Sequence, residues 1–260
     1  MFLRRSFALV ACSAALVLVM AACAGAPGSL SASPSPQTSA STSTSPTPAP
    51  TSTAPVITID SPVEGATASV PVLMSGTADT FEAALTVDAL DEAGDVICAR
   101  SITATSGLGT PGTWETNLAF PPPDSDAPVT LRAYELSAKD GSMTNLVERE
   151  ITVSAERPAI TLTSPVCGAT MTNPGADFLV EGLATVFEAA LTVEFRDAAG
   201  WVILTKDLVT EVGNQESGFS EYVTLPADTP AGFYDVVAFD HSPKDGSIEN
   251  EFSVQVRVRP

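Results

Sequence analysis

The chain has 260 residues, of which 31 are acidic and 12 are basic, so its formal net charge is −19. A protein surface of this sign repels phosphate backbones and anionic lipid headgroups, which argues against nucleic-acid binding. All 31 acidic residues follow Cys23 but only 10 of the basic ones do, so the net charge beyond Cys23 is −21.

The first 22 residues have the layout of an export signal. Arg4 and Arg5 precede a long apolar run, and Met20-Ala21-Ala22-Cys23 resembles a bacterial lipobox. We expect Cys23 to carry a diacylglycerol anchor, which would hold the protein on the outer face of the bacterial cytoplasmic membrane. An ordinary cleaved signal, with an incidental Cys23, is the alternative.

Residues 24–55 form a predicted disordered linker. They are almost all Ser, Thr, Pro, Ala and Gly, without any charged residue. Such a segment cannot bury enough apolar surface to offset the entropy of ordering. In extended polyproline conformations, at about 3.1 Å per residue, it would reach roughly 100 Å from the membrane.

The rest of the chain contains an internal repeat. Phe-Glu-Ala-Ala-Leu-Thr-Val occurs at Phe81–Val87 and again at Phe187–Val193. Lys-Asp-Gly-Ser occurs at Lys139–Ser142 and again at Lys244–Ser247, and the shift between the copies stays between 103 and 106 residues. An internal duplication therefore predicts two tandem modules.

Both copies show an apolar period of two, which is typical of half-buried strands. In the first copy we predict strands at Val56–Asp60, Val70–Ser75, Ala84–Leu90, Asp95–Thr103, Thr113–Phe120, Val129–Leu136 and Leu146–Val153. Seven short strands in about a hundred residues indicate an all-β fold with two tandem immunoglobulin-like sandwiches, module 1 at 56–154 and module 2 at 158–258. A linker of a few residues, ending at Pro158, predicts a stiff pair.

The order of these motifs resembles one known family. Ser-Pro, Gly-Ala-Thr, the Phe-Glu-Ala-Ala-Leu-Thr-Val segment and Ser-x-Lys-Asp-Gly-Ser-x-x-Asn follow one another in both copies. Together they are similar to the immunoglobulin-like domain of bacterial spore germination, of the Gmad type. The resemblance implies an immunoglobulin-like sandwich on an exported bacterial protein and a role in binding.

The candidate binding residues lie in the repeated motifs. Glu82 and Glu188 would either contact a ligand or fix a neighbouring loop, for example by pairing with Lys139 or Lys244. The remaining candidates are Asp140, Ser142, Asn145, Asp245, Ser247 and Asn250. These residues either form a turn or contribute to a binding loop, and their oxygens are too few for the six to eight ligands that Ca²⁺ prefers. We therefore predict no metal site and no cofactor other than the lipid.

Catalysis is not expected. The only histidine, His241, corresponds to Leu136 in the first copy, so the shared design does not use it. Asp240, His241 and Ser242 are consecutive, and adjacent strand residues point to opposite faces, so they cannot form a local triad.

Two cysteines remain after Cys23. Cys98 falls in a predicted strand and Cys167 in a predicted loop of the other module. Export permits a disulfide, but only if the modules bring the two Cα atoms within about 7 Å.

The sequence thus predicts a membrane-anchored, non-catalytic envelope protein whose modules bind an unidentified protein or wall glycan. A carbohydrate- or calcium-binding accessory module and a purely architectural spacer are the alternatives. Trp201 has no aromatic counterpart in the first copy, and would either stack on a sugar or cap the end of the sandwich.

Overall fold

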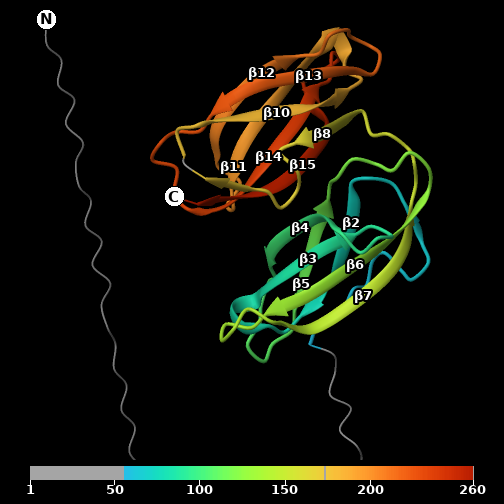
Figure 1. Ribbon diagram of the computed structural model, residues 1–260, viewed down its shortest axis with the longest axis vertical. Helices are drawn as coiled ribbons and strands as arrows, with labels where there is room; N and C mark the ends of the chain where they lie inside the picture. Colours follow the sequence, from blue (N-terminus) through green and yellow to red (C-terminus); the bar gives the residue numbers. More distant parts are fainter. Residues whose placement is uncertain (1–55, 173, 260) are drawn as a thin grey trace, which may run out of the picture. The chain divides into compact units, whose positions relative to one another are not determined.

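The computed structural model describes residues 56–172 and 174–259. These residues belong to one compact unit and form two modules made almost entirely of strands (Figure 1). In this described part, no helix has the length and apolar character needed to cross a bilayer.

Module 1 contains two sheets that pack face to face. The five-stranded sheet has the order β1-β7-β6-β3-β4, and the second sheet pairs β2 with β5. The elements are β1 (Thr67–Ala68), β2 (Val72–Ala78), the 3₁₀ turn η1 (Phe81–Ala83), β3 (Ala84–Leu90), β4 (Val96–Thr103), β5 (Gly112–Leu118), β6 (Ala127–Leu136) and β7 (Met143–Val153).

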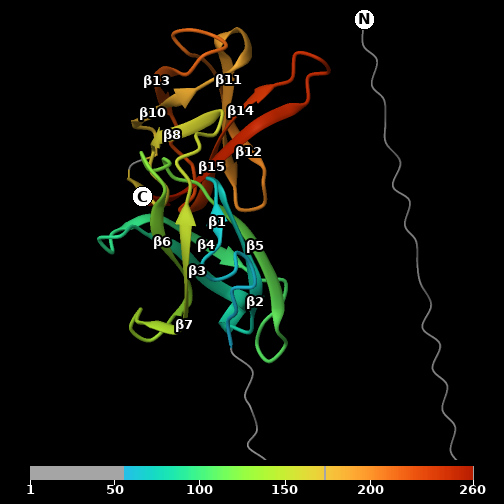
Figure 2. The same ribbon diagram turned by 90° about the vertical axis from the view of Figure 1, so that its right-hand side faces the viewer.

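Module 2 repeats this topology. Its five-stranded sheet has the order β12-β11-β14-β15-β9, and its second sheet has the order β13-β10-β8. The elements are β8 (Ile160–Ser164), β9 (Thr170–Thr172), β10 (Asp177–Ala184), the 3₁₀ turn η2 (Phe187–Ala189), β11 (Ala190–Asp197), β12 (Val202–Val209), β13 (Ser217–Thr224), β14 (Gly232–His241) and β15 (Ile248–Arg259). Figure 2 shows the long hairpin of β14 and β15.

The apolar alternation positions the cores. In β5 every second residue is buried, from Gly112 to Leu118, and Trp114 and Leu118 belong to the hydrophobic core. In module 2, Phe195 and Phe252 fill the same space between the layers. The predicted all-β, tandem immunoglobulin-like architecture is confirmed.

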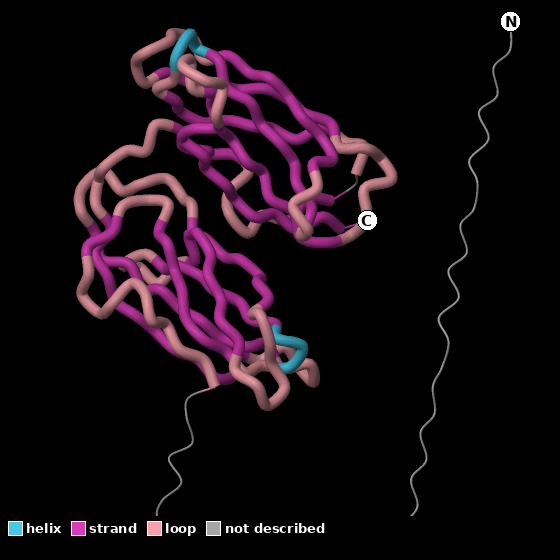
Figure 3. Tube along the Cα trace, turned by 180° about the vertical axis from the view of Figure 1, so that it is seen from behind, coloured by secondary structure: helices cyan, strands magenta, loops and turns pink. Residues whose placement is uncertain are grey.

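One strand prediction needs correction, and a further local feature was not predicted. Residues 56–60 form no continuous strand in module 1, although isolated bridges at Ile57–Ala78 and Ser61–Ser75 and backbone hydrogen bonds, such as that from the Thr58 N–H to the Thr77 carbonyl at 2.9 Å, join this segment to β2. The residues that precede β3 and β11, Phe81–Ala83 and Phe187–Ala189, each form a short 3₁₀ turn, drawn in cyan in Figure 3.

A disulfide joins the modules. The Sγ atoms of Cys98 on β4 and Cys167 in the β8–β9 loop are bonded, and their Cα atoms are 4.7 Å apart. Beside this bond the Arg100 guanidinium forms an ion pair of 2.7 Å with Asp235 on β14. The modules are therefore held by contacts that a short linker alone does not predict.

The Gln255 side chain of β15 covers an open sheet edge of module 1. Its Oε1 accepts a hydrogen bond from the Ser101 N–H at 2.7 Å, and its Nε2 donates to the Ser101 carbonyl at 3.1 Å. Because β4 is the edge strand of its sheet, Gln255 satisfies backbone groups that would otherwise be available to another strand.

Candidate functional site

The Phe-Glu-Ala turn has an unusual backbone in both modules. The φ angles are 54° at Glu82 and 57° at Ala83, and 53° at Glu188 and 60° at Ala189. This left-handed region costs roughly 1–2 kcal/mol for each residue with a Cβ atom. Strain of this kind persists only where surrounding structure imposes it, and it clusters at functional sites.

A glycine lies close against each of these turns. A Cβ atom on Gly107 would lie 2.5 Å from the Thr80 carbonyl oxygen and 2.9 Å from the Ala83 nitrogen. A Cβ atom on Gly213 would lie 2.6 Å from the Ala189 nitrogen. Each turn therefore packs against a glycine of the loop that follows β4 or β12.

An acidic residue near the end of β6 or β14 organises the same end of each module. In module 1, Glu135 accepts hydrogen bonds at 3.0 Å from the Phe81 N–H and from the Asn145 side chain. In module 2, Asp240 accepts a hydrogen bond from Asn250 at 2.9 Å. Glu135 thus links the Phe-Glu-Ala turn to the neighbouring hairpin.

The Lys-Asp-Gly-Ser hairpin is stabilised by its own side chains. Asp140 accepts hydrogen bonds from the hydroxyl of Ser142 at 2.7 Å and from its N–H at 3.1 Å, and the distances for Asp245 and Ser247 are the same. These bonds hold the pKa of both aspartates below its ordinary value. The motif residues serve the turn here, in keeping with Asp-Gly turn chemistry.

Asn145 and Asn250 also have a structural task. Both lie in the left-handed region, with φ of 55°, where the β6–β7 and β14–β15 pairings shift register. Asn tolerates this conformation better than most residues, which suits these two positions beside an irregularity in the strand pairing.

The side chains of Phe81, Glu82 and their counterparts Phe187 and Glu188 take no part in these hydrogen bonds. The Phe81 and Phe187 residues are 57% and 46% exposed. Neither Glu82 nor Glu188 has a side-chain hydrogen bond or ion pair within the described residues, so the expected pairing with Lys139 or Lys244 is not seen in that part of the chain. Each module therefore presents an exposed ring beside an exposed carboxylate.

A groove runs beside each of these turns, and we call it the tip groove. In module 2 it measures 730 Å³ and is bordered by Phe187, Glu188, Val209, His241 and Pro243. In module 1 it measures 770 Å³ and is bordered by Phe81, Glu82, Leu136 and Ala138, with Phe233 and Arg257 of module 2 also lining it. The two tip grooves have the same motif residues but different surroundings.

The chemistry of the tip grooves suits binding. The His241 ring lies 3.1 Å from the Gly246 carbonyl, so its Nδ1 is used by the hairpin backbone. Over residues 56–172 and 174–259, no three His, Cys, Asp or Glu side chains gather as a metal ion would need. An exposed aromatic face and a carboxylate can contact a partner that combines apolar surface with hydrogen-bond donors.

Sequence reasoning found the motifs but missed two kinds of supporting residue. Glu135 and Asp240 are both acidic at equivalent positions, and this shared acidity was the available signal. Gly107 and Gly213 also correspond, but nothing in the sequence shows which backbone atoms approach them. Cys23, the export signal and the 24–55 linker lie outside the described residues.

Two sandwiches with matching sheet order define this chain as a tandem immunoglobulin-like protein. The family model for the immunoglobulin-like domain of bacterial spore germination matches residues 56–142 and 159–247, which is more than half of the chain. The chain therefore belongs to this family, and the predicted resemblance is confirmed. No curated protein matches it.

The solved structures that it is similar to are diverse. A biofilm-associated protein domain is 15% identical over 78% of this chain and 29% of its own, with a TM-score of 0.24. An ICAM-5 D1-D4 ectodomain fragment is 16% identical over 78% of this chain and 53% of its own, with a TM-score of 0.27. The chain thus spans well under two thirds of either protein.

Proposed function

We propose that this protein is a lipid-anchored, extracytoplasmic, non-catalytic binding protein. Its two tip grooves recognise a protein or glycan of the cell envelope. The observation that carries this proposal is the Phe-Glu-Ala turn, which has the same strained backbone and the same exposed side chains in both modules.

Several physical arguments support this role. An exposed aromatic side chain supplies a large contact area for little loss of conformational entropy, and the neighbouring carboxylate adds directional contacts. Family membership supports a binding or architectural module. Two linked sites for one partner raise the apparent affinity without any new contact, provided that both can be engaged at once.

The anchor is a separate part of the proposal. Acyl chains on Cys23 would contribute about 0.8 kcal/mol per buried CH₂ group, and the 24–55 linker would separate the modules from the membrane. Mass spectrometry of the mature amino terminus is expected to show an acylated Cys23. An unmodified cysteine at this position would contradict the proposed lipid anchor.

A carbohydrate-binding accessory role is the second candidate. It is favoured by Trp201, which is 74% exposed and immediately precedes β12. Stacking of a sugar ring on such an indole would place the site away from the repeated motif. A Trp201→Ala variant that loses glycan binding would favour this candidate over the tip grooves.

Binding measurements with envelope fractions test the proposal. The full chain is mixed with purified wall glycan and, separately, with solubilised envelope protein, and the bound fraction is measured. We expect retention by one fraction and its loss in a Phe81→Ser/Phe187→Ser variant. The control variant Val63→Ser/Tyr222→Ser removes side chains that are 66% and 67% exposed elsewhere, and should bind normally. Equal binding by both variants would contradict the tip grooves as the site.

A further inference from the structure

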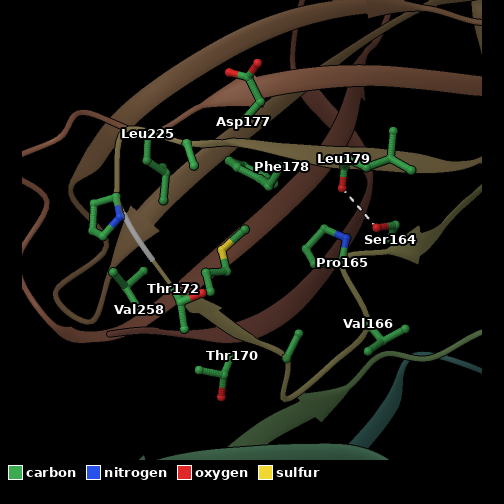
Figure 4. A pocket seen from close by; sticks show the side chains of 14 residues that line it. Ser164, Pro165, Val166, Thr170, Thr172, Asp177, Phe178, Leu179, Leu225 and Val258 are labelled. Atoms are coloured by element: carbon green, nitrogen blue, oxygen red, sulfur yellow. Dashed lines mark hydrogen bonds between the residues drawn. The ribbon is translucent and has the colours of Figure 1, made fainter. Parts of the chain in front are cut away.

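Module 2 contains a cavity that the tip grooves do not use. It measures 380 Å³ and lies between the β8–β9 loop, β9 and the start of β10 (Figure 4). Because β8 and β9 are edge strands of the two sheets, the cavity opens at the side of the sandwich. Its apolar walls come from Pro165, Met171, Phe178, Leu225 and Val258.

In module 1, the region equivalent to this cavity is filled by apolar side chains. Phe178, Leu225 and Val258 correspond to Val72, Phe120 and Val153 of module 1, which are 1%, 2% and 0% exposed. In the connection between β1 and β2, Val70 is also buried, at 4% exposure, and belongs to the hydrophobic core. Module 1 thus closes this side of its sandwich with its own apolar side chains.

Module 2 departs from this pattern in two ways. Thr67 and Val72 are five residues apart, whereas their counterparts Thr170 and Phe178 are eight apart, and no described residue of the longer connection is buried. Leu225 is also smaller than Phe120. As a result, Phe178 is only partly buried, and none of the described side chains in this connection takes the place of Val70.

Two polar side chains around the cavity already have partners. The Ser164 hydroxyl donates a hydrogen bond of 3.0 Å to the Leu179 carbonyl, and the Asp177 carboxylate accepts one from the Thr224 hydroxyl. Figure 4 shows the Asp177 side chain directed away from the cavity. On the inner side, the Phe178 ring packs against Phe195 with centroids 6.0 Å apart, which fixes an aromatic wall.

We propose that this cavity binds a small, uncharged apolar molecule about the size of a single aromatic ring. The ligand would occupy the place that Val70 fills in module 1. The volume falls at the lower end of the range of about 300–1,000 Å³ for small-molecule sites. An anionic ligand would lose its hydration without gaining a partner, because the described lining contains no cationic side chain.

The chain carries its own reporters for a test. Met171 lines the cavity, whereas Met74 is buried in the core of module 1 and Met143 is exposed on its β6–β7 hairpin. The full chain is labelled with ¹³C at the methionine methyl groups and titrated with indole or, separately, with benzoate. We expect a saturable shift of the Met171 signal with indole, none with benzoate, and no shift of Met74 or Met143.

Two variants sharpen the result. Thr170→Trp covers the cavity from its exposed rim, and Thr67→Trp makes the same change at the equivalent site of module 1. Leu225→Phe restores the residue of module 1 and fills the cavity from inside, in case Thr170→Trp disturbs folding. We expect both cavity variants to lose the indole response and Thr67→Trp to keep it.

Three outcomes would overturn the proposal. They are an unchanged Met171 signal, equal and non-saturating shifts of Met171 and Met143, and an indole response that survives Leu225→Phe in a folded chain. None of these readouts depends on the tip grooves. The experiments therefore test the cavity ligand independently of the proposed envelope partner.

Discussion

Asp88 is a buried carboxylate on β3, with 1% of its surface exposed. The Arg132 guanidinium donates two hydrogen bonds to it, at 2.8 and 2.7 Å, and the Tyr134 hydroxyl donates a third at 3.0 Å. A buried charge is tolerated when it is paired and hydrogen-bonded in this way. Module 2 has Glu194 and Phe239 at the equivalent positions of Asp88 and Tyr134, so the network is not part of the shared design.

The network predicts a loss of stability in alkaline solution. Burial, together with the Asp88 carboxylate, raises the pKa of Tyr134 to about 12. In an unfolded chain the value is about 10, so the folded state holds the proton more tightly and its advantage is lost as the pH rises from about 10 to about 12. The free energy of unfolding should fall in this window, and fall less in Tyr134→Phe. Tyr222→Phe, at an exposed site, should behave like the unaltered chain.

The glycine behind each Phe-Glu-Ala turn predicts a second effect at the residue scale. Gly213→Ala brings a methyl group to 2.6 Å from the Ala189 nitrogen, so the turn must move. We expect a loss of about 1–3 kcal/mol in unfolding free energy, measured by chemical denaturation. Gly218→Ala has no atom within 4 Å of the added methyl group and serves as the control. Similar losses in the two variants would contradict the role of Gly213.

At the scale of elements, the sequence pattern predicted the strands better than the turns between them. The strand Ala84–Leu90 was predicted with its observed bounds, because Leu85, Val87 and Ala89 alternate with exposed or paired residues. The 3₁₀ turn before it was not predicted, because Phe-Glu-Ala has no glycine or asparagine to indicate positive φ angles, and its packing against Gly107 involves a residue distant in sequence.

The edge strand β4 provides a prediction at this scale. Gln255 is the partner of both backbone groups of Ser101, so Gln255→Ala should expose the Ser101 amide to solvent. Hydrogen exchange at that amide is expected to accelerate by at least about tenfold, as for an amide that loses its hydrogen bond. The control is Glu150→Ala, which changes the equivalent residue on β7. Unchanged exchange in Gln255→Ala would show that Ser101 is protected by other means.

At the scale of the whole molecule, the disulfide and Arg100–Asp235 join two modules that a linker of a few residues connects. The alignment of the two copies argues partly against this disulfide, because neither cysteine has a counterpart: Cys98 corresponds to Leu204 and Cys167 to Glu64. Contacts between the copies cannot be read from features that the copies share. For the same reason, the repeat predicts the Phe-Glu-Ala segment of both modules but not the residues of module 2 that line the tip groove of module 1.

The disulfide closes a loop with a sequence separation of 69 residues. The chain-entropy model gives a stabilisation of about 4 kcal/mol for a loop of this size. Reduction should therefore lower the free energy of unfolding by about 2–4 kcal/mol. A Cys98→Ala/Cys167→Ala variant should start at the lower value and not respond to the reductant. A response in that variant would point to another origin of the effect.

The central claim is that the two exposed Phe-Glu turns bind an envelope partner. Proximity labelling in the native envelope tests it directly, with the unaltered chain, the single variants Phe81→Ser and Phe187→Ser, and the double variant. The account predicts a defined set of labelled neighbours that decreases in each single variant and is lost in the double variant. No enriched neighbour, or the same set in all four chains, would contradict it and favour a purely architectural spacer.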